Sequence, residues 1–299
     1  MRIDPYYVNT LVGSLDQTTA TEQQLTTELS SGVRVTSLSS DPVAAGQSSV
    51  LSAEISAQDT FVQTAASEQG LLQTTDSALG SAVTQLTTAI SLGVRGNQGS
   101  LNAAEVKIIA QQLTSLRSEV LSLANTTYQG KYIFAGSQGG TQPFSLNTAT
   151  TPATTVYSGD SAVQTLQTPS GQTTQLNLPG NAVFSATGAD VFGALSNLIA
   201  DFSTGTPGPT SAADVGNLKT ALDNVSQQRV VLDGSLNRLQ TASTLSQTNV
   251  AQLSATQTSL VGADTASIAT QLSMSETQHQ ALLNVISTLE KGSLFDYTH

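Results

Sequence analysis

Apolar residues recur along most of the chain at alternating intervals of three and four, which is the spacing of one face of an α-helix. One long pattern runs from Leu51 to Ile90, where apolar residues hold nine of twelve such positions. Asp41 before Pro42 predicts the start of this helix, because the carboxylate can accept hydrogen bonds from free N–H groups and proline fits the first turn. Another long pattern runs from Leu218 to about residue 260. Together they predict long helices packed as an antiparallel rod.

Shorter patterns stand at both ends of the chain, and each has two polar interruptions. Thr18 and Glu22 interrupt the first pattern, which ends at Gly32, while Ser275 and His279 interrupt the last. Because short helices are marginal alone in water, we expect the two terminal helices to pair with each other and with neighbouring subunits. The apolar residues expected at this assembly interface are Leu11, Leu15, Leu25, Leu29, Ile268, Leu272, Leu282, Ile286 and Leu289.

The middle of the chain changes its spacing. A third helix is expected from Asn102, with Glu105 completing a capping box, to Gln129-Gly130. From residue 131 to 180 the spacing approaches two, and Gly, Pro and Asn turns separate short predicted strands. Asp190 then caps a short helix that precedes a Gly/Pro linker, and Ser211 with Asp214 predicts another capping box. The predicted fold is mainly α with a small β/α insert at the tip of the rod.

Three domains follow from this division. Residues 1–35 and 262–299 form the terminal helical assembly domain, in which the ends pair as a coiled coil. Residues 40–130 and 211–261 form the helical rod, and residues 131–210 form the β-rich insert.

Composition excludes several classes of function. Charged residues make up 10% of the chain, against about 25% in typical soluble domains, and the net charge is −11. The few Lys and Arg residues are scattered, which argues against nucleic acid and anionic membranes as partners. With no cysteine and two histidines, the chain has little material for a metal site, a catalytic triad or a cofactor site. We therefore expect a protein that is not an enzyme, with His279 in a packing or interface role.

Several motifs resemble those of one family. Leu29-Ser30-Ser31-Gly32-Val33-Arg34-Val35 and Ser40-Asp41-Pro42-Val43-Ala44-Ala45 resemble the signature shared by flagellins and hook-associated proteins. Further stretches resemble the hook–filament junction proteins (hook-associated protein 3) of this flagellin-like family. They are Leu123–Thr126, Gly130-Lys131-Tyr132-Ile133-Phe134-Ala135-Gly136, Pro143-Phe144, Val156-Tyr157-Ser158-Gly159-Asp160 and Ser293-Leu294-Phe295-Asp296-Tyr297.

The resemblance implies a structural part of the extracellular bacterial flagellum that is needed for swimming motility. It implies a ring of subunits between the first hook-associated protein and the flagellin filament. It also implies type III export and a cytoplasmic export chaperone at the C-terminal segment. The N-terminus has no pattern of a cleaved signal peptide, which is compatible with that route. Two alternatives stay open: a filament-forming flagellin, and a coiled-coil surface adhesin that presents the insert to a ligand.

Overall fold

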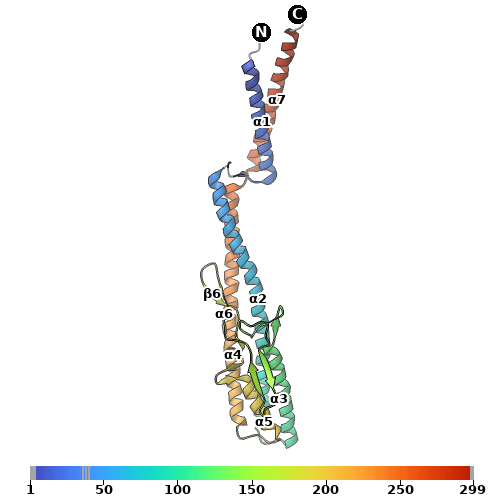
Figure 1. Ribbon diagram of the computed structural model, residues 1–299, viewed down its shortest axis with the longest axis vertical. Helices are drawn as coiled ribbons and strands as arrows, with labels where there is room; N and C mark the ends of the chain where they lie inside the picture. Colours follow the sequence, from blue (N-terminus) through green and yellow to red (C-terminus); the bar gives the residue numbers. More distant parts are fainter. Residues whose placement is uncertain (1–4, 36, 38, 40, 297–299) are drawn as a thin grey trace. The chain divides into compact units, whose positions relative to one another are not determined.

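The computed structural model describes residues 5–35, 37, 39 and 41–296 (Figure 1). The chain forms two compact units. The terminal unit comprises Met1–Ala57 and Thr248–His299, and the central unit comprises Gln58–Gln247. Two long helices, α2 (Pro42–Gly96) and α6 (Ser211–Val261), contribute residues to both units. Long helices with a small strand-containing insert confirm the predicted fold class.

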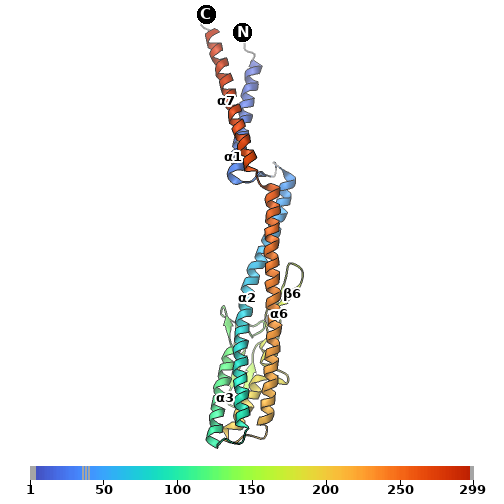
Figure 2. The ribbon, with the colours of Figure 1, turned by 180° about the vertical axis from the view of Figure 1, so that it is seen from behind.

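In the terminal unit, α1 (Pro5–Ser31) and α7 (Thr265–Asp296) lie side by side and antiparallel (Figures 1 and 2). Their direction follows from two contacts: Ala263 N donates to Gly32 O at 3.0 Å, and Glu22 pairs with His279 further along. Helix α1 ends where the sequence predicts, because Gly32 has a φ of 69°, a left-handed conformation that glycine adopts without strain.

In the central unit, α2 and α6 run antiparallel. The Ser211 hydroxyl lies 2.6 Å from Asn97 Oδ1, and Arg229 Nε donates to Asp76 Oδ1 at 2.8 Å. Residue numbers therefore rise along one helix as they fall along the other. Helix α3 (Ala103–Ala124) packs into the same core, and Figure 2 shows it beside α2.

The insert connects α3 to α6 and is built from short elements. Its described strands pair as four two-stranded antiparallel sheets, β1 with β2, β3 with β4, β5 with β6 and β7 with β8. The elements are β1 (Thr127–Tyr128), β2 (Lys131–Tyr132), β3 (Phe144–Asn147), β4 (Thr154–Tyr157), β5 (Thr165–Gln167), β6 (Thr173–Gln175), α4 (Gly180–Val183), β7 (Ser185–Ala186), β8 (Ala189–Asp190) and α5 (Val191–Ser203).

One core joins the insert to the helices. Phe144 is fully buried, and its ring centroid lies 5.7 Å from that of Phe184 and 5.3 Å from that of Phe192. The same hydrophobic cluster includes Leu113 of α3 and Leu218 of α6. Because small two-stranded sheets are not stable alone, packing against the helices is what holds the insert in place.

The insert is fastened to the end of α3 by a pair of reciprocal hydrogen bonds. Asn125 Nδ2 donates to Phe144 O at 2.9 Å, and Phe144 N donates to Asn125 Oδ1 at 3.0 Å. Nearby, the Tyr157 hydroxyl donates to Phe134 O at 3.0 Å, and the Asp160 carboxylate accepts from Ser137 N at 2.8 Å. The family-like motifs of this region therefore contact one another, although they lie far apart in the sequence.

Three capping predictions are confirmed. Asp41 Oδ1 accepts from Ala44 N at 3.0 Å, and Asp190 Oδ1 accepts from Phe192 N at 3.0 Å. Both halves of the capping box of Asn102 and Glu105 are formed.

Two other predictions of helix ends are wrong. Helix α3 ends at Ala124 rather than at Gln129-Gly130, because Asn125 bonds to the insert. Gln129 and Gly130 instead form the β1–β2 turn, with positive φ angles of 50° and 78°. The predicted capping box of Ser211 and Asp214 is also absent from this described segment, since Asp214 N donates to Thr210 O.

Candidate functional site

The residues predicted for the assembly interface lie on both helices of the terminal pair. Leu25 of α1 and Ile268 of α7 are buried, while Leu29 of α1 is 37% exposed. Five others are half-buried, namely Leu11, Leu15, Leu272, Leu282 and Ile286. The side chain of Leu289 lies outside the described residues. Contact between α1 and α7 therefore leaves much of the predicted apolar seam partly open to solvent.

The middle of the pair is polar. Thr18 and Ser275 are buried, and His279 Nδ1 lies 3.0 Å from Glu22 Oε2. The other Glu22 carboxylate oxygen is buried without a hydrogen bond from the described residues. The four residues that interrupt the sequence pattern are thus all in or near the contact between the helices. A polar contact of this kind stabilises the pair less than a continuous apolar seam does.

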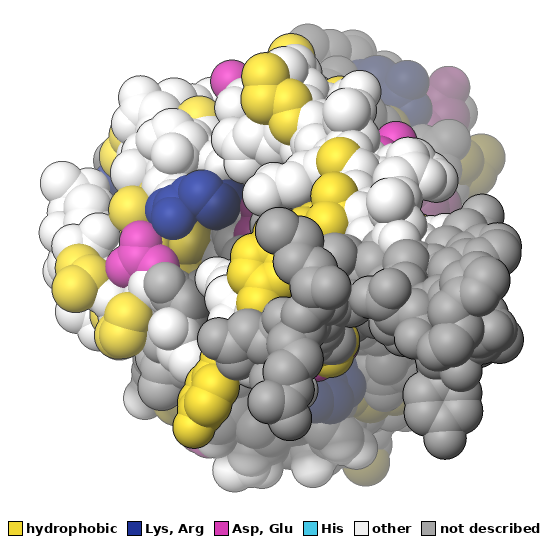
Figure 3. All heavy atoms as spheres, turned by 90° about the horizontal axis from the view of Figure 1, so that it is seen from above, with side chains coloured by type: hydrophobic (Ala, Val, Ile, Leu, Met, Phe, Trp, Pro, Cys, Tyr) yellow, Lys and Arg dark blue, Asp and Glu magenta, His cyan; other side chains and the backbone are white. Residues whose placement is uncertain are grey.

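Exposed hydrophobic side chains are frequent in the terminal unit, and the sequence pattern identifies only Leu29 among them. The described chain has sixteen large hydrophobic residues with highly exposed side chains, and nine lie in the terminal unit. They are Tyr6, Tyr7, Val12, Leu29, Val43, Val50, Met274, Leu283 and Val285. All but Leu29 lie outside the seam positions, so a search restricted to that spacing passes over them. Figure 3 shows hydrophobic side chains at several separate places on the surface, with charged side chains beside some of them.

A short β-bridge connects the terminal pair to the start of α2 and the end of α6. Val33 pairs with Gly262, and Arg34 N donates to Val261 O at 2.8 Å. The Arg34 side chain donates to Leu260 O at 3.2 Å and lies 3.4 Å from Asp41 Oδ2. The Ala44 N–H and the Arg34 guanidinium hold the pKa of Asp41 below its usual value. Arg34, which is the only basic residue between Arg2 and Arg95 in the sequence, therefore makes an ion pair although half of its side chain is exposed.

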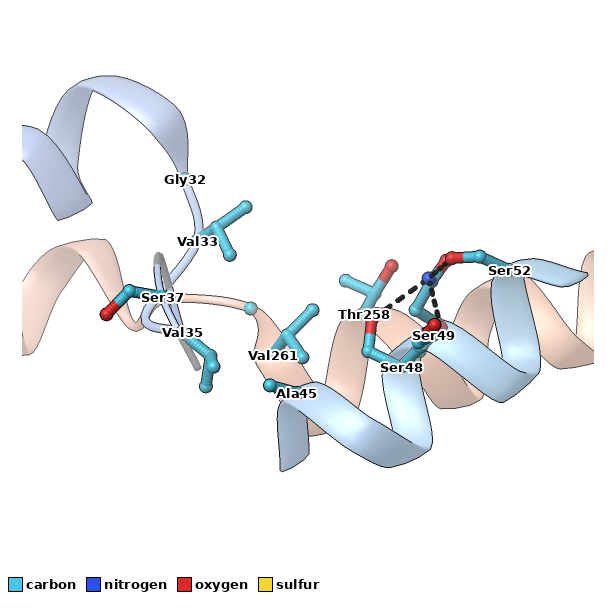
Figure 4. Close-up of a pocket in the computed structure, with 12 residues that line it drawn as sticks. Gly32, Val33, Val35, Ser37, Ala45, Ser48, Ser49, Ser52, Thr258 and Val261 are labelled. Carbon is cyan, nitrogen blue, oxygen red and sulfur yellow. Dashed lines mark hydrogen bonds between the residues drawn. The ribbon is translucent and has the colours of Figure 1, made fainter. Parts of the chain in front are cut away.

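Beside this bridge lies an open cavity of about 660 Å³ (Figure 4). Gln257 Nε2 donates to Ser48 Oγ at 3.1 Å and to Ser52 Oγ at 2.6 Å, which joins α6 to α2. Val33 and Val261 line the other side. The lining has hydroxyl and amide groups but no charged side chain, so the cavity suits packing against neutral chain segments better than chemistry.

The remaining candidate chemistry is sparse. Within the described ranges, no three His, Cys, Asp or Glu side chains are grouped so that they could hold a metal ion. Of the helices in that part of the chain, none combines the length and the apolar character needed to cross a membrane.

Comparisons with known proteins agree with the predicted resemblance. Residues 7–139 match the bacterial flagellin N-terminal helical region. The chain is 29% identical to flagellar hook-associated protein 3 of Salmonella typhimurium over 294 residues, and 28% identical to that of Escherichia coli over 296 residues. Each alignment covers 90% of both chains.

A solved structure confirms the fold. The flagellar junction protein FlgL from Legionella pneumophila aligns with a TM-score of 0.59 and 16% identity, over 72% of this chain and all of that one. The sequence matches and the shared fold together confirm the resemblance: this chain is similar to hook-associated protein 3 over nine tenths of its length, and residues 7–139 match the flagellin N-terminal helical region.

Proposed function

We propose that this chain is a structural component of the bacterial flagellum that joins the hook to the flagellin filament. The observation that carries the proposal is the similarity to flagellar hook-associated protein 3 over 90% of both chains. The shared fold of a protein described as the flagellar junction protein supports it. In this role the chain is needed for filament assembly and swimming motility, and it contacts the first hook-associated protein on one side and flagellin on the other.

The terminal unit supports a role in assembly. Nine of the sixteen most exposed large hydrophobic side chains lie there, although the unit is the smaller of the two. Exposed apolar surface of this kind marks sites of contact with other proteins. We propose that the half-buried seam residues Leu11, Leu15, Leu282 and Ile286 become buried against neighbouring subunits in a ring. Contacts of this head-to-tail type need not be self-complementary.

Three roles follow for the predicted domains. The terminal helical domain, residues 1–35 and 262–299, contacts other subunits during assembly. The helical rod comprises residues 40–130 and 211–261, and the insert on it comprises residues 131–210. We also propose that the chain leaves the cell through the flagellar type III apparatus without cleavage of a signal peptide. A cytoplasmic export chaperone then holds the C-terminal segment, including α7, before export.

Deletion of the gene tests the junction role. We expect hooks to remain without filaments, with flagellin released into the medium, because the filament has lost its attachment. Electron microscopy of the deletion strain gives the answer, and normal-length filaments on its hooks would refute the proposal.

Self-assembly separates a junction protein from a flagellin, an alternative favoured by the matched flagellin N-terminal region. A filament protein fits its own kind at both ends and forms open polymers from one component. A junction protein fits two different neighbours, so we expect the purified chain to remain monomeric or form short oligomers. Long fibres from the pure protein would favour the flagellin alternative.

A single substitution tests the assembly surface. Leu282→Asp places a charge on a half-buried seam position, whereas Gln280→Asp places the same charge on an exposed position of α7. We expect loss of motility and of filament attachment with the first variant only, and unchanged melting of the central unit with both. Full motility of the Leu282→Asp strain would contradict the assignment of this surface.

A further inference from the structure

A cavity of about 430 Å³ opens in the central unit between α2 and the insert. Its lining includes Glu68 and Leu71 of α2, the β1–β2 hairpin, and Gln164 and Asn177 of the insert. Its volume lies within the range of small-molecule sites in proteins. The flagellar role proposed above makes no use of this cavity.

Two opposite charges line the cavity without meeting. Glu68 comes from α2 and Lys131 comes from β2. Among the described residues, neither side chain has a hydrogen bond or an ion pair. Burial raises the pKa of Glu68, and no neighbouring charge opposes this effect. A positive ligand group beside Glu68 would therefore improve the environment of a carboxylate that is now partly desolvated and unpaired.

Aromatic side chains complete the walls. Tyr128 and Tyr132 both line the cavity, one at each end of the hairpin turn. The Tyr128 hydroxyl lies 3.5 Å from Ser67 O, and Gly70 leaves the room that this ring needs against α2, since a Cβ there would collide with the hydroxyl. The Tyr128 ring is thus fixed near Glu68. Tyrosine rings attract ammonium groups through their π-faces, which adds to the attraction of the carboxylate.

We propose that this cavity binds a small zwitterion, an amino acid or a short peptide, with its ammonium group at Glu68 and Tyr128 and its carboxylate facing Lys131. The pair of charges selects this class. A purely cationic ligand is repelled by Lys131, and a purely anionic ligand is repelled by Glu68. A zwitterion pairs with both residues and fits a cavity of this volume.

Calorimetric titration of the full-length protein tests the proposal. The zwitterionic probes are glycine, γ-aminobutyrate and triglycine, and the singly charged controls are ethylamine and propionate. We expect at least one zwitterion to bind with millimolar affinity or better, and each control to bind about tenfold more weakly or not at all, because each control lacks one of the two charged contacts. Preference for glycine indicates a free amino acid, while preference for triglycine indicates a peptide.

Matched variants identify the site. Glu68→Gln and Lys131→Gln each remove one charge from the cavity, and we expect each to weaken binding about tenfold. Glu119→Gln and Lys107→Gln remove the same charges from exposed positions on α3 and should leave binding unchanged. Circular dichroism should show the same melting temperature for all four. No heat from any zwitterion at millimolar concentration overturns the proposal, as does equal weakening by the α3 variants.

Discussion

Phe144→Ala tests whether the insert and the long helices share one core. The Phe144 side chain is fully buried, and its ring lies against those of Tyr157, Phe184 and Phe192, with centroids 5.0, 5.7 and 5.3 Å away. Truncation of a buried phenylalanine costs about 3–5 kcal/mol, through lost burial and the cavity left behind. For a unit of this size, each kcal/mol lowers the melting temperature by roughly 2–4 °C. We therefore expect a decrease of about 10 °C.

Two probes report the result. Circular dichroism follows the helices, and tyrosine fluorescence includes Tyr128, Tyr132 and Tyr157 of the insert. The melting temperatures from the two probes should decrease together, because Phe144 belongs to the same hydrophobic cluster as residues of the helices. The matched control is Val156→Ala on β4, a strand neighbour whose side chain is 50% exposed. Its free energy of unfolding should change by about 0.5 kcal/mol or less.

The shared core is refuted by either of two results. In one, the insert loses its tyrosine signal at a lower temperature while the helices melt as in the wild type. In the other, Phe144→Ala and Val156→Ala cost the same, which would mean that burial at this site contributes little.

Three further predictions follow from the polar contacts. Ser137, through its hydroxyl and its N–H, lowers the pKa of Asp160, so Asp160→Asn should destabilise the protein at neutral pH. Because the ionised form is the stabilising one, the difference in stability between the wild type and Asp160→Asn should shrink as the pH falls below about 4. Melting at several pH values measures this, and the control Asp223→Asn, on an exposed position, should show neither effect. Asp76→Ala should cost only about 0.2–1 kcal/mol in urea unfolding, because its pair with Arg229 is about one-third exposed; a cost above this range would show that the pair acts as a buried one. Brief proteolysis of the monomer should remove both terminal helices before it cuts the central unit, and equal protection of both would contradict the weakness of the polar seam.

Helix starts could be predicted from the sequence because their contacts are local. Each of these helices is capped by a residue at its own start, namely Asp41, Asn102 or Asp190. Both partners of each capping hydrogen bond therefore lie within a few residues of each other in the sequence. The fold class could be predicted for a similar reason, since periodicity distinguishes helices from strands. The family-like motifs indicated the resemblance to hook-associated protein 3, which the comparisons confirm.

The end of α3 and the pairing of polar residues could not be predicted in this way. Asn125 ends the helix because its amide meets Phe144, nineteen residues later, and no local signal shows that contact. Asp76 is a polar residue within the apolar pattern from Leu51 to Ile90, and only the fold shows that its partner is Arg229 of another helix. Apart from Leu29, the exposed apolar residues of the terminal unit lie off the seam, so the helical spacing does not indicate them. In each case the deciding contact or surface depends on the tertiary arrangement.

The polar seam positions explain how one chain can combine a stable central unit with weakly paired terminal helices. In the central unit, the Asp76–Arg229 pair lies beside a seam in which Leu72, Leu79 and Leu86 are fully buried, so apolar packing carries the stability. In the terminal unit, Thr18 and Ser275 take buried positions that leucine could fill. We infer that such polar positions fix the register of α1 on α7 while keeping their pairing weak. In the assembly role proposed above, a weak pair would leave apolar surface for neighbouring subunits, and assembly would then supply the burial that the free chain lacks.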